Sequence, residues 1–188
     1  GSRIGYSFDF RDNTESGLTI DRNKRFTNVT GNVVGISTPR KVEYSEARGN
    51  ISFDWDWGTL SAGKGFMEWG YGEGGKLVLS TKAPSYFYVR LDIEPVSWLS
   101  FNYIHGWLAS DVVDSVRSYR TGSTVGGGNR ILFREKYLAS HTLTLRPLKG
   151  LSIALGESIV YSDRLEPLYL FPLMFYKAAD HYLSKQNN

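Results

Sequence analysis

Apolar and polar residues alternate with a period of two along much of this chain. In residues 3–11, Ile4, Tyr6, Phe8 and Phe10 fall on one side, and charged or small residues fall on the other. Successive side chains of a β-strand point to opposite faces, so the pattern predicts strands with one apolar and one polar face. The segments with this pattern are 3–11, 50–57, 87–94, 97–108 and 151–157.

The connections between these segments differ in length in a regular way. Short connections fall near 12–16, 57–59, 94–97 and 146–150, and long ones near 22–41, 70–86 and 109–135. Their alternation predicts about eight antiparallel strands, with all tight turns at one end of the sheet and all long loops at the other. Outer-membrane barrels have short periplasmic turns and long extracellular loops. The expected fold is therefore all-β, an antiparallel transmembrane β-barrel.

Two soluble folds share the alternating strands. A β-sandwich and a lipocalin-like barrel would both turn the apolar faces inward. The membrane barrel is favoured because the apolar faces are rich in aromatic residues, the polar faces carry charges on neighbouring strands, and segments 42–57 and 97–108 are long for a globular protein. Tryptophan also recurs near the expected strand ends, as an interfacial girdle requires, at Trp57, Trp69, Trp98 and Trp107.

Composition narrows the function classes. The 188 residues carry a formal net charge of +3 without a dense basic run, so a nucleic-acid partner is not expected. The chain has no cysteine, which excludes disulfides, thiol nucleophiles and thiolate metal sites. No apolar run approaches the roughly 20 residues of a membrane helix. We expect residues 1–188 to be one domain, a fragment of a single barrel.

No motif in the sequence indicates catalysis. The three histidines, His105, His141 and His181, have no metal-ligand spacing, and we expect no metal or cofactor. The carboxylate pairs Asp54/Asp56 and Asp92/Glu94 leave a glycosidase reading open, although a solvated polar face explains them as well. Two stretches are rich in glycine, residues 70–75 and residues 126–128. Neither has the lysine followed by serine or threonine that a phosphate-binding loop needs. The chain is predicted not to be an enzyme.

A set of charged residues lies within and beside the polar faces and includes Asp92. Such charges either brace the lumen of a barrel by ion pairing or line a path for a polar ligand. Aromatic side chains in the long loops could stack on sugar rings. The candidate ligand-binding residues are Lys64, Glu68, Tyr71, Arg90 and Glu157.

Several ordered segments resemble one family. The runs Met67-Glu68-Trp69-Gly70-Tyr71-Gly72, Lys76–Ser80, Ala83–Leu91, Thr144–Leu151, Leu155–Tyr161 and Glu166–Leu173 together cover roughly residues 50–176. In their order and spacing they are similar to the Wzi-like capsule-assembly family of outer-membrane proteins. The segments resemble the Bacteroidota branch of this family, which includes members associated with gliding motility and the cell surface.

The resemblance implies an eighteen-stranded barrel in the outer membrane that holds capsular polysaccharide at the cell surface without catalysing a reaction. It implies as partners surface polysaccharide, outer-membrane lipid and other surface-assembly proteins. With about eight strands, this chain is expected to be a partial barrel. The family's periplasmic helical portion is missing, and no sugar-contacting position is transferred from it.

One segment has helical character. After Pro172, residues 174–183 are good helix formers, and we expect a short helix folded into the lumen or over the barrel mouth. Two other functions stay open at this point. They are a porin-like channel in the outer membrane and a soluble glycan-binding or glycan-active β-domain.

Overall fold

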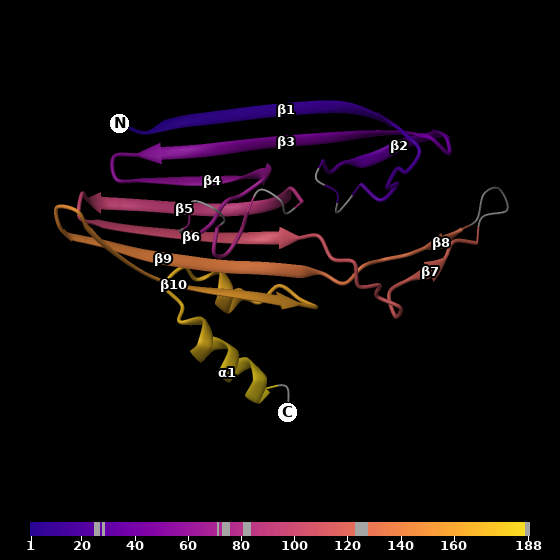
Figure 1. Cartoon of the computed structure of the whole chain (residues 1–188). Helices are drawn as coiled ribbons and strands as arrows, with labels where there is room; N and C mark the ends of the chain where they lie inside the picture. The colour runs from indigo at the N-terminus through magenta and orange to yellow at the C-terminus, as the bar shows by residue number, and fades with distance from the viewer. Residues whose placement is uncertain are drawn as a thin grey trace.

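The computed structural model describes residues 1–24, 27, 29–70, 72, 76–80, 84–122 and 128–186. The chain forms one large antiparallel sheet, a separate small hairpin and a short helical C-terminal segment (Figure 1). The sheet strands are β1 (Arg3–Ser16), β2 (Asn32–Thr38), β3 (Lys41–Trp55), β4 (Gly58–Gly65), β5 (Tyr86–Val96), β6 (Leu99–Leu108), β9 (Lys136–Leu148) and β10 (Leu151–Ser162). The hairpin is β7 (Tyr119–Arg120) with β8 (Asn129–Arg130), and the helices are η1 (Pro167–Leu170) and α1 (Tyr176–Gln186). The predicted all-β antiparallel fold is confirmed.

The long strands follow one another in the order β1-β3-β4-β5-β6-β9-β10. β2 pairs with Lys41–Ser45 of β3, beyond the stretch that β4 covers, so β3 is paired along both edges. Two-residue turns join β3 to β4, β5 to β6 and β9 to β10, all at one end of the sheet. The connections 17–31, 66–85 and 109–135 lie at the other end (Figure 1). The predicted separation of tight turns from long connections holds for these strands, but a fourth two-residue turn, Pro39-Arg40 between β2 and β3, lies at the end with the long connections.

The first part of the chain differs from the prediction. β1 runs without a break from Arg3 to Ser16, so the short connection expected near 12–16 is wrong. Its polar residues stay in the ladder because Asn13 and Glu15 stand opposite Tyr44 and Val42 of the longer β3. Backbone pairing, which the polarity of individual residues does not reveal, extends the strand. β2 in turn lies inside the long connection expected at 22–41.

The two edges of the sheet run in the same direction. Each neighbouring pair from β1 to β10 is antiparallel, and the path contains seven strands, counting the two edge strands. Within the described residues β1 and β10 do not pair with each other, so the sheet is open. Closing it with antiparallel pairs alone requires an odd number of additional strands between β10 and β1, because neighbouring strands must alternate in direction.

The polar face of the sheet is the better covered one. Cross-strand pairs place Val42, Tyr88 and Ile104 on this face, and all three side chains are buried. The connection after β4 folds over them, where Trp69 packs with Tyr86, Tyr88 and Ile104. This connection is held to itself by the backbone hydrogen bonds Trp69 N to Leu79 O, 3.0 Å, and Leu79 N to Trp69 O, 3.1 Å.

The apolar face is largely open over the first strands. Tyr6 is 89% exposed, Phe8 75% and Ile51 57%, and Phe53 and Ile153 are also exposed. A soluble sheet places its apolar face in the core and its polar face in water. This sheet has the reverse order over β1, β3, β4 and β5.

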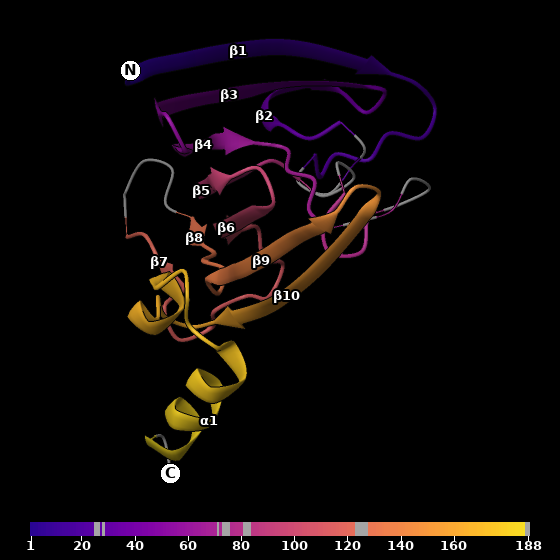
Figure 2. The same cartoon turned by 90° about the vertical axis from the view of Figure 1, so that its left-hand side faces the viewer.

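The C-terminal segment covers the remaining part of the apolar face. The predicted helix is confirmed as α1, but it does not lie on the polar face. Tyr169 of η1 and Tyr176 and Ala179 of α1 form a buried cluster with Ala139 of β9. Figure 2 shows this yellow segment beside β10, at the edge of the sheet opposite β1. Within the described residues, no helix has the length and apolar character that crossing a membrane demands.

Candidate functional site

Charged side chains on the polar face form pairs that cross from β1 to β6. Arg48 of β3 donates to Asp9 of β1, and Arg11 approaches the same carboxylate at 3.1 Å. Register places these three side chains on the polar side of the first two strands. The arrangement is a network with alternating charge, in which each carboxylate accepts from more than one donor. Charged hydrogen bonds of this kind are stronger than neutral ones.

The network continues on the following strands. Glu46 is buried and accepts hydrogen bonds from Lys64 Nζ, at 2.9 Å, and from Ser85 Oγ. Further along, Arg90 makes two hydrogen bonds to Asp92, of 2.7 and 3.0 Å. Asn102 Nδ2 donates to the same carboxylate at 2.5 Å. Asp92 therefore accepts three hydrogen bonds from two neighbouring side chains, which hold its carboxylate in place.

The connection between β4 and β5 brings an indole ring to this network. The Arg90 guanidinium lies over the ring of Trp69, 5.7 Å from its centroid. A Cβ on Gly106 would stand 2.7 Å from the ring of Tyr86. A glycine at this position therefore leaves room for that ring beneath the connection.

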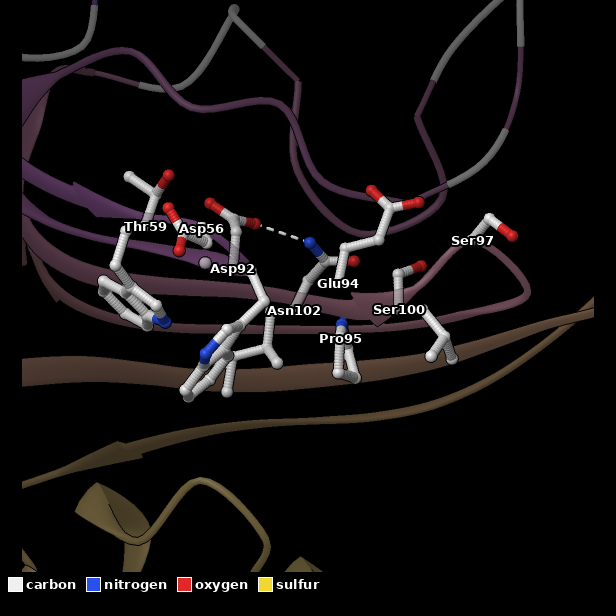
Figure 3. Close-up of a pocket in the computed structure, with 13 residues that line it drawn as sticks. Asp56, Thr59, Asp92, Glu94, Pro95, Ser97, Ser100 and Asn102 are labelled. Atoms are coloured by element: carbon white, nitrogen blue, oxygen red, sulfur yellow. Dashed lines mark hydrogen bonds between the residues drawn. The ribbon is translucent and has the colours of Figure 1, made fainter. Parts of the chain in front are cut away.

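A hollow of about 570 Å³ lies at the tight-turn end of the sheet. Figure 3 shows the carboxylates of Asp56, Asp92 and Glu94 pointing to the same side, with Asn102 bonded to Asp92. Polar groups also line it at Thr59, Ser97 and Ser100. Two indole rings complete the lining, those of Trp55 and Trp57, which meet edge to face at 5.2 Å. Carboxylate, amide and hydroxyl groups beside an aromatic surface suit a ligand rich in hydroxyl groups.

A second polar cluster lies on the opposite, apolar face. Tyr103 Oη donates to the backbone oxygen of Tyr169 at 2.9 Å, and His105 Nε2 lies 2.8 Å from Tyr161 Oη. His141 lies 4.0 Å from Glu157. These groups are covered by the C-terminal segment, whose Tyr176 amide donates to Glu157 Oε2 at 2.8 Å. The cluster joins the helix to the sheet.

The tyrosines that close this cluster from outside the strands are held in their neutral form. Burial raises the pKa of Tyr176 and of Tyr169 above the usual value of a phenol. Nearby carboxylates raise the pKa further, because a phenolate would be repelled by them. Neutral phenols can pack against the rings beneath them.

The structure separates the five residues proposed from the sequence. Lys64 and Arg90 both belong to the charged network of the polar face. Glu68 is exposed in the connection beside Trp69. Glu157 differs from expectation, because it stands opposite His141 on the apolar face and holds α1. Tyr71 lies outside the described residues.

Sequence reasoning missed several members of the network. Asp9, Glu46 and Arg48 were not proposed, although each lies at a polar position of an alternating or charged segment. Only the register between β1 and β3 brings Asp9 to Arg48, which is 39 residues away. Asn102 is also missing from the proposed set, and its contact with Asp92 again depends on the pairing of two strands.

Neither metal chemistry nor similarity adds a further assignment. Among the residues that the structure describes, no group of three histidine, aspartate or glutamate side chains is arranged to hold a metal ion. Comparison of the chain with family models, with curated proteins and with solved structures finds no match.

Proposed function

We propose that this chain is part of an outer-membrane β-barrel that binds surface polysaccharide without catalysing a reaction. One observation carries the membrane assignment. The apolar faces of β1 and β3 are exposed at Tyr6, Phe8 and Ile51, whereas on the opposite face the connection through Trp69 packs over Tyr86, Tyr88 and Ile104. In a barrel wall, the apolar side of each strand meets lipid and the polar side meets the lumen.

The dimensions of the apolar face support the same assignment. Phe87, Trp107, Tyr137 and Tyr161 stand opposite one another across β5, β6, β9 and β10 and form an aromatic row near the long connections. Trp57 and Trp98 lie in tight turns at the other end. From Phe87 to Val96, β5 advances nine residues. That is about 30 Å of strand, or about 23 Å along the axis for a tilt of about 40°, close to the apolar band of outer-membrane barrels.

The open edges also bear on this proposal. Unpaired backbone groups at a sheet edge cost several kcal/mol each in lipid, so both edges must be paired in a membrane. Because β1 and β10 run in the same direction, antiparallel closure takes an odd number of further strands. With seven strands in the path, this gives the even total that is usual for bacterial outer-membrane barrels.

The polar face supports glycan binding over a chemical role. The hollow at the tight-turn end combines hydroxyl, amide and carboxylate groups with two indoles. Asp92, the carboxylate that a glycosidase would need there, is held by Arg90 and Asn102. The resemblance to the Wzi-like family points to the same class of ligand, capsular or other surface polysaccharide. We favour this function over an open channel because the connection through Trp69 packs onto the face that a channel would keep clear.

Neighbouring residues on one strand offer a direct test of the membrane assignment. Because the chain has no cysteine, Ile51→Cys on the apolar face and Ser52→Cys on the polar face can each carry one environment-sensitive fluorophore. In phospholipid vesicles we expect the label at residue 51 to be quenched by spin-labelled lipid. The matched label at residue 52 should respond to a water-soluble quencher instead. A folded protein that stays in solution without detergent and shows no lipid quenching at residue 51 would refute the proposal.

A further inference from the structure

The connection between β6 and β9 forms an ordered extension beyond the strand ends. We call residues 112–134 the arm; it carries the β7–β8 hairpin and lies to the right of the sheet in Figure 1. Its base is joined by the hydrogen bonds Asp114 N to Leu132 O and Arg134 N to Val112 O, both 2.8 Å. Ser118 Oγ joins its two sides by accepting from Leu132 N at 3.0 Å and donating to Asp114 O at 2.6 Å.

The hairpin itself is closed by one threonine. Thr121 N donates to Gly128 O at 2.9 Å, and Thr121 Oγ1 accepts from Gly128 N at 3.0 Å. The arm therefore has cross-links at its base, its middle and the start of its tip. Side chains on it are held in fixed relative positions, as a binding surface needs.

The arm is basic. Residues 112–134 contain four arginines and one acidic residue, Asp114, which lies 3.8 Å from Arg117. Two of the arginines are paired near the base, Arg117 with Glu135 at 3.5 Å and Arg134 with Asp163 at 3.4 Å. Arg120 and Arg130 sit on the hairpin, where the described residues offer neither of them a carboxylate. Arg120 does bond Asn129 Oδ1 at 3.1 Å, which orients its guanidinium.

An aromatic ring shares one face of the hairpin with a free cation. Tyr119 stands directly opposite Arg130 in the β7–β8 ladder, so both side chains project to the same side. Tyr119 is half exposed, and Arg130 is exposed. A ring can lie against the apolar face of a sugar, while a guanidinium takes two oxygens of a carboxylate or similar anion.

We propose that the β7–β8 hairpin binds an acidic polysaccharide through Tyr119 and Arg130 on one face, with Arg120 as a second cation on the other face. This inference rests on the function proposed above and names the charge class of its ligand. The site is separate from the hollow at the tight-turn end, whose three carboxylates suit uncharged, hydroxyl-rich units of a polysaccharide, whereas the hairpin takes its acidic units. The basic arm lies at the long-connection end, so acidic units of the polymer are attracted there.

The experiment measures binding of the detergent-solubilised protein to immobilised polygalacturonate, with dextran as the neutral polymer. We expect Arg120→Gln/Arg130→Gln to weaken polygalacturonate binding about tenfold or more and to leave dextran binding unchanged. The matched control Arg117→Gln/Arg134→Gln removes the same charge from the base of the arm and should weaken binding less than about threefold. Tyr119→Leu should weaken binding, and Tyr119→Phe should keep it, because the ring is what stacks.

Each outcome decides between two ideas. Equal losses from both double variants would mean that only net charge matters, which overturns the site. Equal binding of both polymers, unaffected by any of these variants, overturns the acidic specificity and leaves the polysaccharide function standing. Binding to neither polymer refutes the polysaccharide function and this inference together. Binding that moves to phosphate-bearing lipopolysaccharide vesicles alone would replace the polysaccharide by a lipid headgroup. The folded state of every variant is checked by its near-ultraviolet circular dichroism.

Discussion

The apolar face of the sheet has two halves that the molecule treats differently. Near the tight-turn end of β1, β3 and β4 the face consists mainly of aliphatic and aromatic side chains, and many of them are exposed. Over β6, β9 and β10 the same face also contains Tyr103, His105, His141 and Glu157, and the C-terminal segment lies on it. Polar groups are costly in hydrocarbon unless they find partners. The cover therefore lies where the face has polar groups that need partners.

The largest effect is expected when a buried ring of the C-terminal segment is removed. Tyr176 is 2% exposed and touches the rings of His141 and Tyr169. We expect Tyr176→Ala to lower the free energy of unfolding by about 3–5 kcal/mol, as for other large core residues. Tyr6→Ala, in the open half, should cost less than about 1 kcal/mol. Urea titration followed by tryptophan fluorescence compares the two, and equal losses would remove the distinction between the halves.

A charged residue placed on the exposed part of the apolar face should lower the free energy of unfolding by slightly less. We expect this loss only when the protein is inserted in lipid. In vesicles, Ile51→Arg should lower stability by about 2–4 kcal/mol, whereas Leu148→Arg, beside a tight turn, should cost about 0–1 kcal/mol. The cost depends on depth because a cation near the interface reaches water. Urea unfolding of vesicle-inserted protein gives both values. An Ile51→Arg change within about 0.5 kcal/mol would show that this face meets water.

The smallest effect concerns the carboxylate that holds the helix. Glu157 accepts the Tyr176 amide at the N-terminus of α1, where a negative charge is favoured. Glu157→Gln should cost about 1–2 kcal/mol of unfolding free energy, since a charged acceptor is replaced by a neutral one. Glu94→Gln, which removes the carboxylate of an exposed pair with Arg146, should cost less than about 0.5 kcal/mol. A Glu157→Gln loss no larger than that of the control would contradict its role in fixing the helix.

Much of the sheet was predictable because alternation is a local property. Side chains such as Phe53 and Leu91 belong to the apolar face whatever the strands pair with. Tight turns could likewise be placed, since Gly150 and Pro95 mark two of them in the sequence. The end of β1 was predicted wrongly because its last residues are polar, and only the length of β3 keeps them paired.

The candidate site was less accessible to sequence reasoning. Lys64 and Arg90 were identified by their charge, but their partners Glu46 and Asp92 are set by strand register. Glu157 lies on the apolar face of β10, because it is on the same side of the strand as Leu155 and Ile159. A carboxylate at such a position was a signal that something must cover it, although the sequence alone did not indicate that α1 would.

The sequence by itself determined which face of most strands is apolar and where several of the tight turns lie. These properties depend on neighbouring residues, so they need no knowledge of distant contacts. The tertiary structure alone decided that the C-terminal segment covers part of the apolar face around Ala139 while this face stays open on β1 and β3, and that Asp9 meets Arg48. Those outcomes depend on register and on the path of the C-terminal segment, which join residues that are far apart along the chain.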